Sequence, residues 1–199
     1  MSKRDAILLA AREAFLRDGY GGTSMDQLAE DAGVARRTLY NQFANKEALF
    51  RAVVADLWKN LPSTDIVQLA MTATYSDNVE ASLTEIGMAI ANHWAPPVVR
   101  AFLRMVIVEE DRFPELPGDF YRFGKEPIIQ AVQDFLIRKT EEGRINVADP
   151  LLATQQFIGM INEPLIWLRL VRLGAYPDIA RREEVVRSAV HSFLRGYAV

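Results

Sequence analysis

Apolar residues recur along most of this chain at spacings of three and four positions, which is the periodicity of one face of an α-helix. The first stripe consists of Ile7, Ala10, Ala11, Ala14 and Phe15. We expect Gly19 to end this first helix, because glycine is common just after a last helical turn. No stretch of alternating β-branched residues bounded by turns is found, so the pattern predicts an all-α protein.

Two short helices follow the first one. Ser24 and Gln27 are spaced as in a capping box, in which the serine oxygen accepts a backbone amide proton and the glutamine side chain reaches back. Gly33 ends that helix, and another begins near Ala35. Two short helices joined by a tight glycine turn predict a helix-turn-helix motif.

The second short helix has an apolar side and a polar side. If Leu39 and Phe43 face the core, the 100° step per residue turns a polar set outward or to the flanks. This set consists of Arg36, Arg37, Thr38, Tyr40 and Asn41. Arginine can bind guanine, asparagine can bind adenine and the threonine methyl group suits thymine. Because the second helix of such a motif enters the major groove, this side chain set predicts base reading and phosphate binding.

Charge and composition refine this interpretation. The chain has 23 Lys and Arg against 26 Asp and Glu, a net charge of −3 that would by itself argue against nucleic acid. No acidic residue lies between Asp31 and Glu47, however, and Lys46 adds its charge there. Lys46, Thr23 and Ser24 lie at helix starts, where we expect them to contact phosphates.

Several classes of protein are excluded or disfavoured. The absence of cysteine excludes thiol catalysis, zinc ribbons and disulfide scaffolds. Neither a signal peptide nor an apolar run long enough to span a membrane is found, so we expect a cytoplasmic protein without membrane contact. His93 and His191 are the two histidines and belong to no metalloprotease motif. We expect neither a metal nor a cofactor nor enzyme activity, and we interpret Glu109-Glu110-Asp111 as a solvated helix end.

The prolines suggest how the chain is divided. A helix over residues 46–60 is terminated by Pro62, and longer apolar stripes separated by proline breaks follow it. We therefore predict a helix-turn-helix domain over residues 1–61, which includes this linking helix, and a second helical domain over residues 62–199.

The stretch from Thr23 to Phe50, with Gly19-Tyr20 and Ile7 before it, resembles the DNA-binding domain of the TetR/AcrR family of transcriptional regulators. This resemblance implies base contacts from Arg36, Arg37 and Thr38, and phosphate contacts from Tyr40 and Lys46. Asn41 is added from the helical wheel alone. Ala35 departs from the family, which often has a small hydroxyl residue there, and alanine at an N-cap costs about 1 kcal/mol.

The second domain carries a weaker resemblance. Arg112 to Leu116, followed by Phe120-Tyr121, looks like the ligand-binding domain of AefR-like repressors. In that family this domain binds a small molecule among its middle helices and dimerises through its last two. Candidate effector-binding residues are Trp94, Phe102, Arg104, Met105, Phe120, Phe123, Met160, Asn162, Glu163 and Trp167. The apolar ones suit a ligand cavity, although each taken singly also fits plain core packing, and the three polar ones interrupt apolar helices.

Two apolar helix faces near the C-terminus are candidates for a dimer interface, because two helices that meet their symmetry mates form a four-helix bundle. The candidate residues are Leu152, Gln155, Gly159, Val186, Val190 and Phe193. A bundle that uses these faces within one chain is the alternative.

Taken together, the sequence predicts a homodimeric transcriptional repressor that binds a near-palindromic DNA operator and is released by a small lipophilic effector of unknown identity. The alternative is a helix-turn-helix regulator without such an effector, which a protein partner controls or which acts globally.

Overall fold

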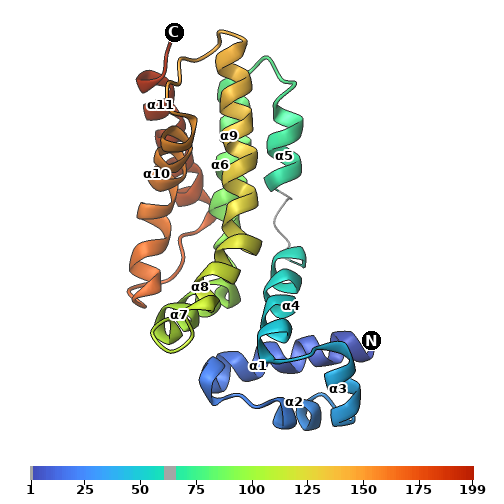
Figure 1. Cartoon of the computed structure of the whole chain (residues 1–199). Coiled ribbons are helices and arrows are strands. Elements are labelled where there is room, and N and C mark those ends of the chain that lie inside the picture. The colour runs from blue at the N-terminus through green and yellow to red at the C-terminus, as the bar shows by residue number, and fades with distance from the viewer. Residues whose placement is uncertain (1, 61–65) are drawn as a thin grey trace. The chain divides into compact units, whose positions relative to one another are not determined.

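The computed structural model describes residues 2–60 and 66–199, and this described part contains helices and no strand (Figure 1). The predicted all-α fold class is therefore confirmed. The boundary expected after residue 61 and the helix end expected at Pro62 lie outside the described residues.

The chain divides into two compact units that differ from the two contiguous domains we expected. The first unit comprises Met1–Leu61 and Ala101–Lys125, and the second comprises Pro62–Arg100 and Glu126–Val199. Residues 101–125 join the first unit because they pack against its helices, as described below.

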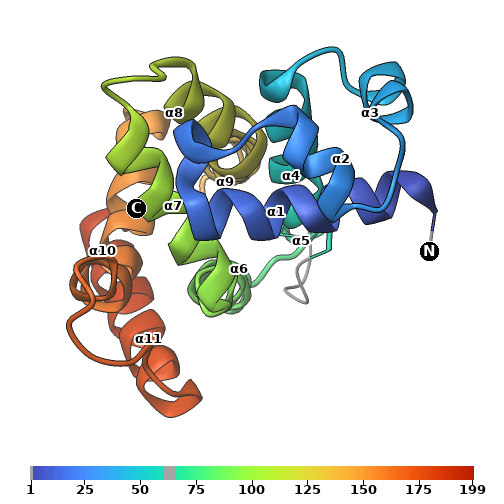
Figure 2. The same cartoon turned by 90° about the horizontal axis from the view of Figure 1, so that it is seen from below.

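The first unit begins with four helices. They are α1 (Lys3–Gly22), α2 (Met25–Asp31), α3 (Arg36–Gln42) and α4 (Lys46–Lys59). The unit also contains most of α7 (Pro97–Glu109), α8 (Glu115–Phe120) and the π-helical turn η1 (Tyr121–Lys125). Figure 2 shows α1 lying across α4, with α2 and α3 joined by a short turn. In the core between α1 and α4, the rings of Phe15 and Tyr20 stack, and Phe50 meets both of them edge to face.

Two expected helix boundaries differ in detail. Gly19 has a φ of 77°, which breaks α1 as expected, but one more turn follows it up to Gly22. Ser24 Oγ accepts a hydrogen bond from the backbone N–H of Gln27 at 3.2 Å. The Gln27 side chain does not complete the predicted capping box, because its amide donates to Asp31 Oδ1 one turn further along α2.

The second unit is a helical bundle. Its helices are α5 (Ile66–Ala73), α6 (Val79–His93), α9 (Glu126–Glu141), α10 (Pro150–Leu170) and α11 (Ile179–Gly196), which run alongside one another in Figure 1. Its core is one apolar cluster to which all five helices contribute. Among the described helices, none combines the length and the apolar character needed to cross a membrane.

Candidate nucleic-acid interface

Helix α3 presents one face to the core and the opposite face to solvent. Leu39 and Phe43 are buried, which fixes the rotation of the helix about its axis. Arg37 and Asn41 are consequently exposed, and the Tyr40 side chain is 48% exposed. The helix therefore has the orientation that the apolar spacing predicts, and its outer face carries groups that can bind bases and phosphates.

The two adjacent arginines of α3 have different surroundings. Arg36 Nη1 lies 2.8 Å from Asp26 Oδ2 of α2, and its Nη2 lies 3.9 Å from Glu30 Oε1. Arg37 forms no ion pair with any residue in the part of the chain that the structure describes. Exposed ion pairs contribute only about 0–1 kcal/mol, so Arg36 can leave these carboxylates and bind DNA at small cost. Arg37 can bind DNA without breaking an ion pair within the described residues.

The hydroxyl groups expected to contact phosphates take part in local structure. The buried Thr23 hydroxyl donates to the Gly19 carbonyl at 2.8 Å, and the Ser24 oxygen caps α2. Thr38 is partly buried at the first turn of α3. The phosphate contacts of Thr23 and Ser24 stay predictions, and they would have to coexist with these capping bonds.

Lys46, expected to hold a phosphate, is turned inward. Its ammonium group donates to the carbonyls of Tyr20 at 2.7 Å and Thr23 at 2.9 Å, and it lies 4.5 Å from the centre of the Tyr20 ring. Desolvation by burial lowers the pKa of Lys46, which the nearby Glu109 carboxylate partly opposes. In this structure the side chain holds the connection between α1 and α2. Its predicted phosphate contact would require these bonds to be exchanged.

Glu109 corrects a second expectation. It is not part of a solvated helix end, because it is 9% exposed and its Oε1 accepts a hydrogen bond from the backbone N–H of Gly21 at 3.1 Å. Its neighbours Glu110 and Asp111 are exposed, and no cluster of metal-ligating side chains occurs among the described residues. The sequence held a signal for this, since Glu109 continues the buried stripe of Phe102 and Val106 on α7.

Helix α4 is attached to α8 and η1 by contacts that sequence reasoning missed. Arg51 Nε lies 2.7 Å from Oδ2 of the buried Asp119. The Trp58 ring packs edge to face on Phe120, with ring centres 5.2 Å apart, and also lies directly against the backbone of Gly124. These contacts connect α4 to a segment some sixty residues later, so no local pattern could reveal them.

The expected effector-binding residues are distributed over both units. Phe102, Arg104, Met105, Phe120 and Phe123 belong to the first unit, and Trp94, Met160, Asn162, Glu163 and Trp167 belong to the second. Within their units Phe102 and Phe120 are buried, whereas Trp167 is 60% exposed and Glu163 is exposed. Asn162 Oδ1 is buried and has no hydrogen-bond partner among the described residues.

The expected dimer residues divide into two groups. Val186, Val190 and Phe193 of α11 lie in the core of the second unit, so their assignment to an interface is wrong. A Cβ atom added to Gly87 of α6 would lie 2.8 Å from Val186 Cγ1, which shows how closely these helices pack within one chain. The α10 residues Leu152, Gln155 and Gly159 are exposed, and these three stay candidates.

Comparisons with known proteins place this geometry in a family. A family model described as "Bacterial regulatory proteins, tetR family" matches residues 7–53. The chain is 38% identical over 89 residues to the transcriptional repressor ComR of Escherichia coli, a match that covers 45% of this chain and 41% of ComR. It is 43% identical over 60 residues to the E. coli regulator RutR, which covers 29% of this chain and 28% of RutR. The chain thus spans less than half the length of these two regulators.

Solved structures match almost the whole chain. A TetR-family regulator from Mesorhizobium loti has a TM-score of 0.86 and 26% identity, with 99% of this chain and 97% of that chain covered. The flavonoid-responsive regulator FrrA has a TM-score of 0.80 and 27% identity, with 98% and 97% covered. A second family model, described as "AefR-like transcriptional repressor, C-terminal domain", matches residues 81–199, which is more than half of the chain. The chain therefore belongs to the TetR family of bacterial transcriptional regulators, and its C-terminal domain is of the AefR-like type.

Proposed function

We propose that this regulator binds a near-palindromic operator as a homodimer, represses transcription and leaves the DNA when a small lipophilic effector binds. The observation that carries the DNA-binding part is the exposed face of α3, where Arg37 and Asn41 are accessible while Leu39 and Phe43 are fixed in the core. In a dimer, the two α3 helices would lie about 34–36 Å apart or a multiple of that distance, so that both enter the major groove of one DNA site.

The Arg37→Ala variant tests the base-reading role. Duplexes selected by the wild-type protein from a random pool serve as the probe, and fluorescence anisotropy measures affinity. Loss of a bidentate arginine contact should cost about 1–3 kcal/mol and relax the preference at one base pair. Lys59→Ala, at the exposed end of α4, removes the same charge as a control. An Arg37→Ala variant with wild-type affinity and base preference would refute the assignment.

The exposed face of α10 supports dimerisation. A Cβ atom added to Gly159 would have no other atom within 4 Å, so Gly159→Arg should leave the fold of one chain intact while it blocks an approaching copy. Gly118 in α8 is equally open, and Gly118→Arg is the matched control. We expect analytical ultracentrifugation to show a monomer for Gly159→Arg and a dimer for the control. A dimeric Gly159→Arg variant would exclude this face.

Two observations support a lipophilic effector with a polar group. The buried Asn162 Oδ1 lacks a donor within the described chain, and such an atom is costly unless something supplies one. The similar regulator FrrA is flavonoid-responsive by its name. We therefore expect flavonoid aglycones, as the first probe, to release the selected duplex from the wild-type protein. Asn162→Leu should keep the DNA affinity and lose the release. If no such compound affects DNA binding, a regulator without a small-molecule effector becomes the better explanation.

A further inference from the structure

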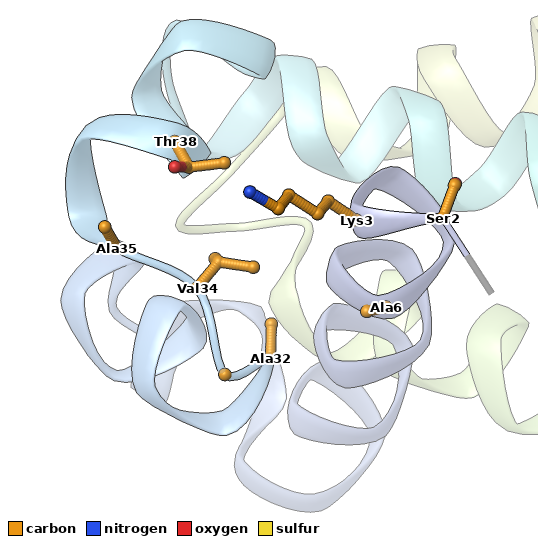
Figure 3. Close-up of a pocket in the computed structure, with 8 residues that line it drawn as sticks. Ser2, Lys3, Ala6, Ala32, Val34, Ala35 and Thr38 are labelled. Carbon is orange, nitrogen blue, oxygen red and sulfur yellow. The ribbon is translucent and has the colours of Figure 1, made fainter.

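Two carboxylates of α2 lie against one arginine at the start of α3. Asp26 and Glu30 are one helical turn apart and therefore share a face of α2. The turn after α2, which contains Ala32 and Val34, leads directly into α3 (Figure 3). Arg36 Nη1 consequently lies 2.8 Å from Asp26 Oδ2, and its Nη2 lies 3.9 Å from Glu30 Oε1. The closer of the two contacts is the one to Asp26.

This group of three side chains is accessible and is negative overall. The exposed fraction of the side chain is 61% for Arg36, 48% for Asp26 and 66% for Glu30. Two carboxylates face one guanidinium group, so one negative charge is left over. The adjacent Arg37 is also exposed and forms no ion pair within the described residues. Helix α3 thus offers DNA one arginine that is held by its own chain and one that is not.

The ion pair competes with DNA for Arg36. Any contact between Arg36 and DNA requires its guanidinium group to leave Asp26. The two carboxylates then lose their cation, and like charges one helical turn apart repel each other. An exposed ion pair of this kind changes an equilibrium constant by about 2- to 5-fold. The competition is therefore weak enough to be overcome and strong enough to be measured.

We propose that Asp26 is an autoinhibitory residue, which holds Arg36 away from DNA and keeps the affinity below what the cations of α3 would otherwise give. Glu30 assists it through the longer contact. This inference rests on the proposed DNA-binding function of α3. Because the competition takes place within the protein, it lowers the affinity for every duplex and does not depend on the base sequence.

The first test measures affinity by fluorescence anisotropy, with the selected duplex and with a scrambled duplex of the same length. Asp26→Asn keeps the size of the side chain and removes its charge, so it should raise the affinity for both duplexes about 2- to 5-fold. Glu30→Gln should raise it by less. Glu13→Gln removes an exposed carboxylate of α1 that forms no ion pair within the described residues, and it should leave the affinity unchanged.

A double-mutant cycle then identifies the group on which Asp26 acts. In an Arg36→Ala background, Asp26→Asn should have no further effect, because the residue that it releases is gone. In an Arg37→Ala background, the full gain of Asp26→Asn should remain, because Arg37 is not held. Thermal denaturation midpoints equal to that of each parent protein show that the substitutions leave the fold intact.

Four results would overturn the proposal, and they are distinguishable. An unchanged affinity for Asp26→Asn, with normal binding by the wild type, refutes autoinhibition alone. A gain that persists in the Arg36→Ala background shows that the carboxylate repels DNA directly instead of holding Arg36. A lowered midpoint together with a lowered affinity for Asp26→Asn assigns the ion pair to the stability of α2 and α3. A wild-type protein that selects no duplex refutes the proposed function together with this inference.

Discussion

The buried Glu109 offers the sharpest test of how the first unit is stabilised, because an exposed glutamate follows it directly. Glu109→Ala removes the acceptor of the Gly21 N–H, which lies 3.1 Å from Glu109 Oε1. Glu110→Ala removes the same charge from the adjacent, exposed position. Any difference between the two variants therefore reports the buried contact and not the net charge of the protein.

The burial and the charge of this hydrogen bond allow the size of the difference to be estimated. A hydrogen bond to a charged group contributes about 1.5–3 kcal/mol, so Glu109→Ala should lower the free energy of unfolding by about 2 kcal/mol. Glu109→Gln keeps an oxygen that can accept from Gly21 but loses the charge, and a neutral bond contributes about 0.5–1.5 kcal/mol. This variant should therefore lose about 1 kcal/mol. Glu110→Ala should stay within about 0.5 kcal/mol of wild type.

Urea denaturation and hydrogen exchange measure these effects on the full chain. For a protein of this size, about 2 kcal/mol corresponds to a decrease in Tm of roughly 4–8 °C. Glu109→Ala should also accelerate exchange in the peptide that contains Gly21, whereas Glu110→Ala should not. Equal stability and equal exchange for the two alanine variants would show that the Glu109 bond contributes nothing and would refute the reasoning.

Two further effects follow from buried groups. Burial lowers the pKa of His93 to about 4 from its ordinary value of 6.5. Between these two pH values, the imidazole therefore binds a proton in the unfolded state but stays neutral in the folded state. Stability should therefore decrease as the pH falls from 6.5 toward 4, by about 3 kcal/mol in all. His93→Gln should flatten the pH dependence of stability in acid titrations followed by circular dichroism. His191→Gln, at an exposed histidine, should leave that dependence unchanged. Equal curves for the two variants would contradict the assignment of this effect to His93. Gly124→Ala places a Cβ atom inside the Trp58 ring and should lower Tm by several degrees. Gly118→Ala, whose added Cβ has no other atom within 4 Å, should leave Tm unchanged. Equal Tm values for the two variants would show that the Trp58 ring moves aside freely.

The features that the sequence predicted correctly are those set by local periodicity. The spacing of Leu39 and Phe43 fixes which face of α3 is buried, and a helix rotated in this way must expose Arg37 and Asn41. The all-α class follows from the same periodicity repeated along the chain. Neither inference needs information about what lies across from the helix.

The features that were missed depend on a partner that is distant in the sequence. The apolar stripe of Val186, Val190 and Phe193 is real, but periodicity shows only that a face is apolar and not whether its own chain or a second copy covers it. In this protein α6 and α10 of the same chain cover it. Lys46 shows the same limit for a charge, because its ammonium group binds carbonyls more than twenty residues earlier instead of solvent.

The way cations are used in the first unit also bears on specificity. Arg17, Arg36 and Arg51 form ion pairs with carboxylates of their own unit, and Lys46 binds carbonyls. The exposed ion pairs of Arg17 and Arg36 can be exchanged for phosphates at small cost, but the net charge of −3 weakens the long-range attraction of the whole protein to arbitrary DNA. Its affinity for non-specific DNA should therefore be weak and only moderately dependent on salt. Discrimination must then come mainly from base contacts such as that proposed for Arg37.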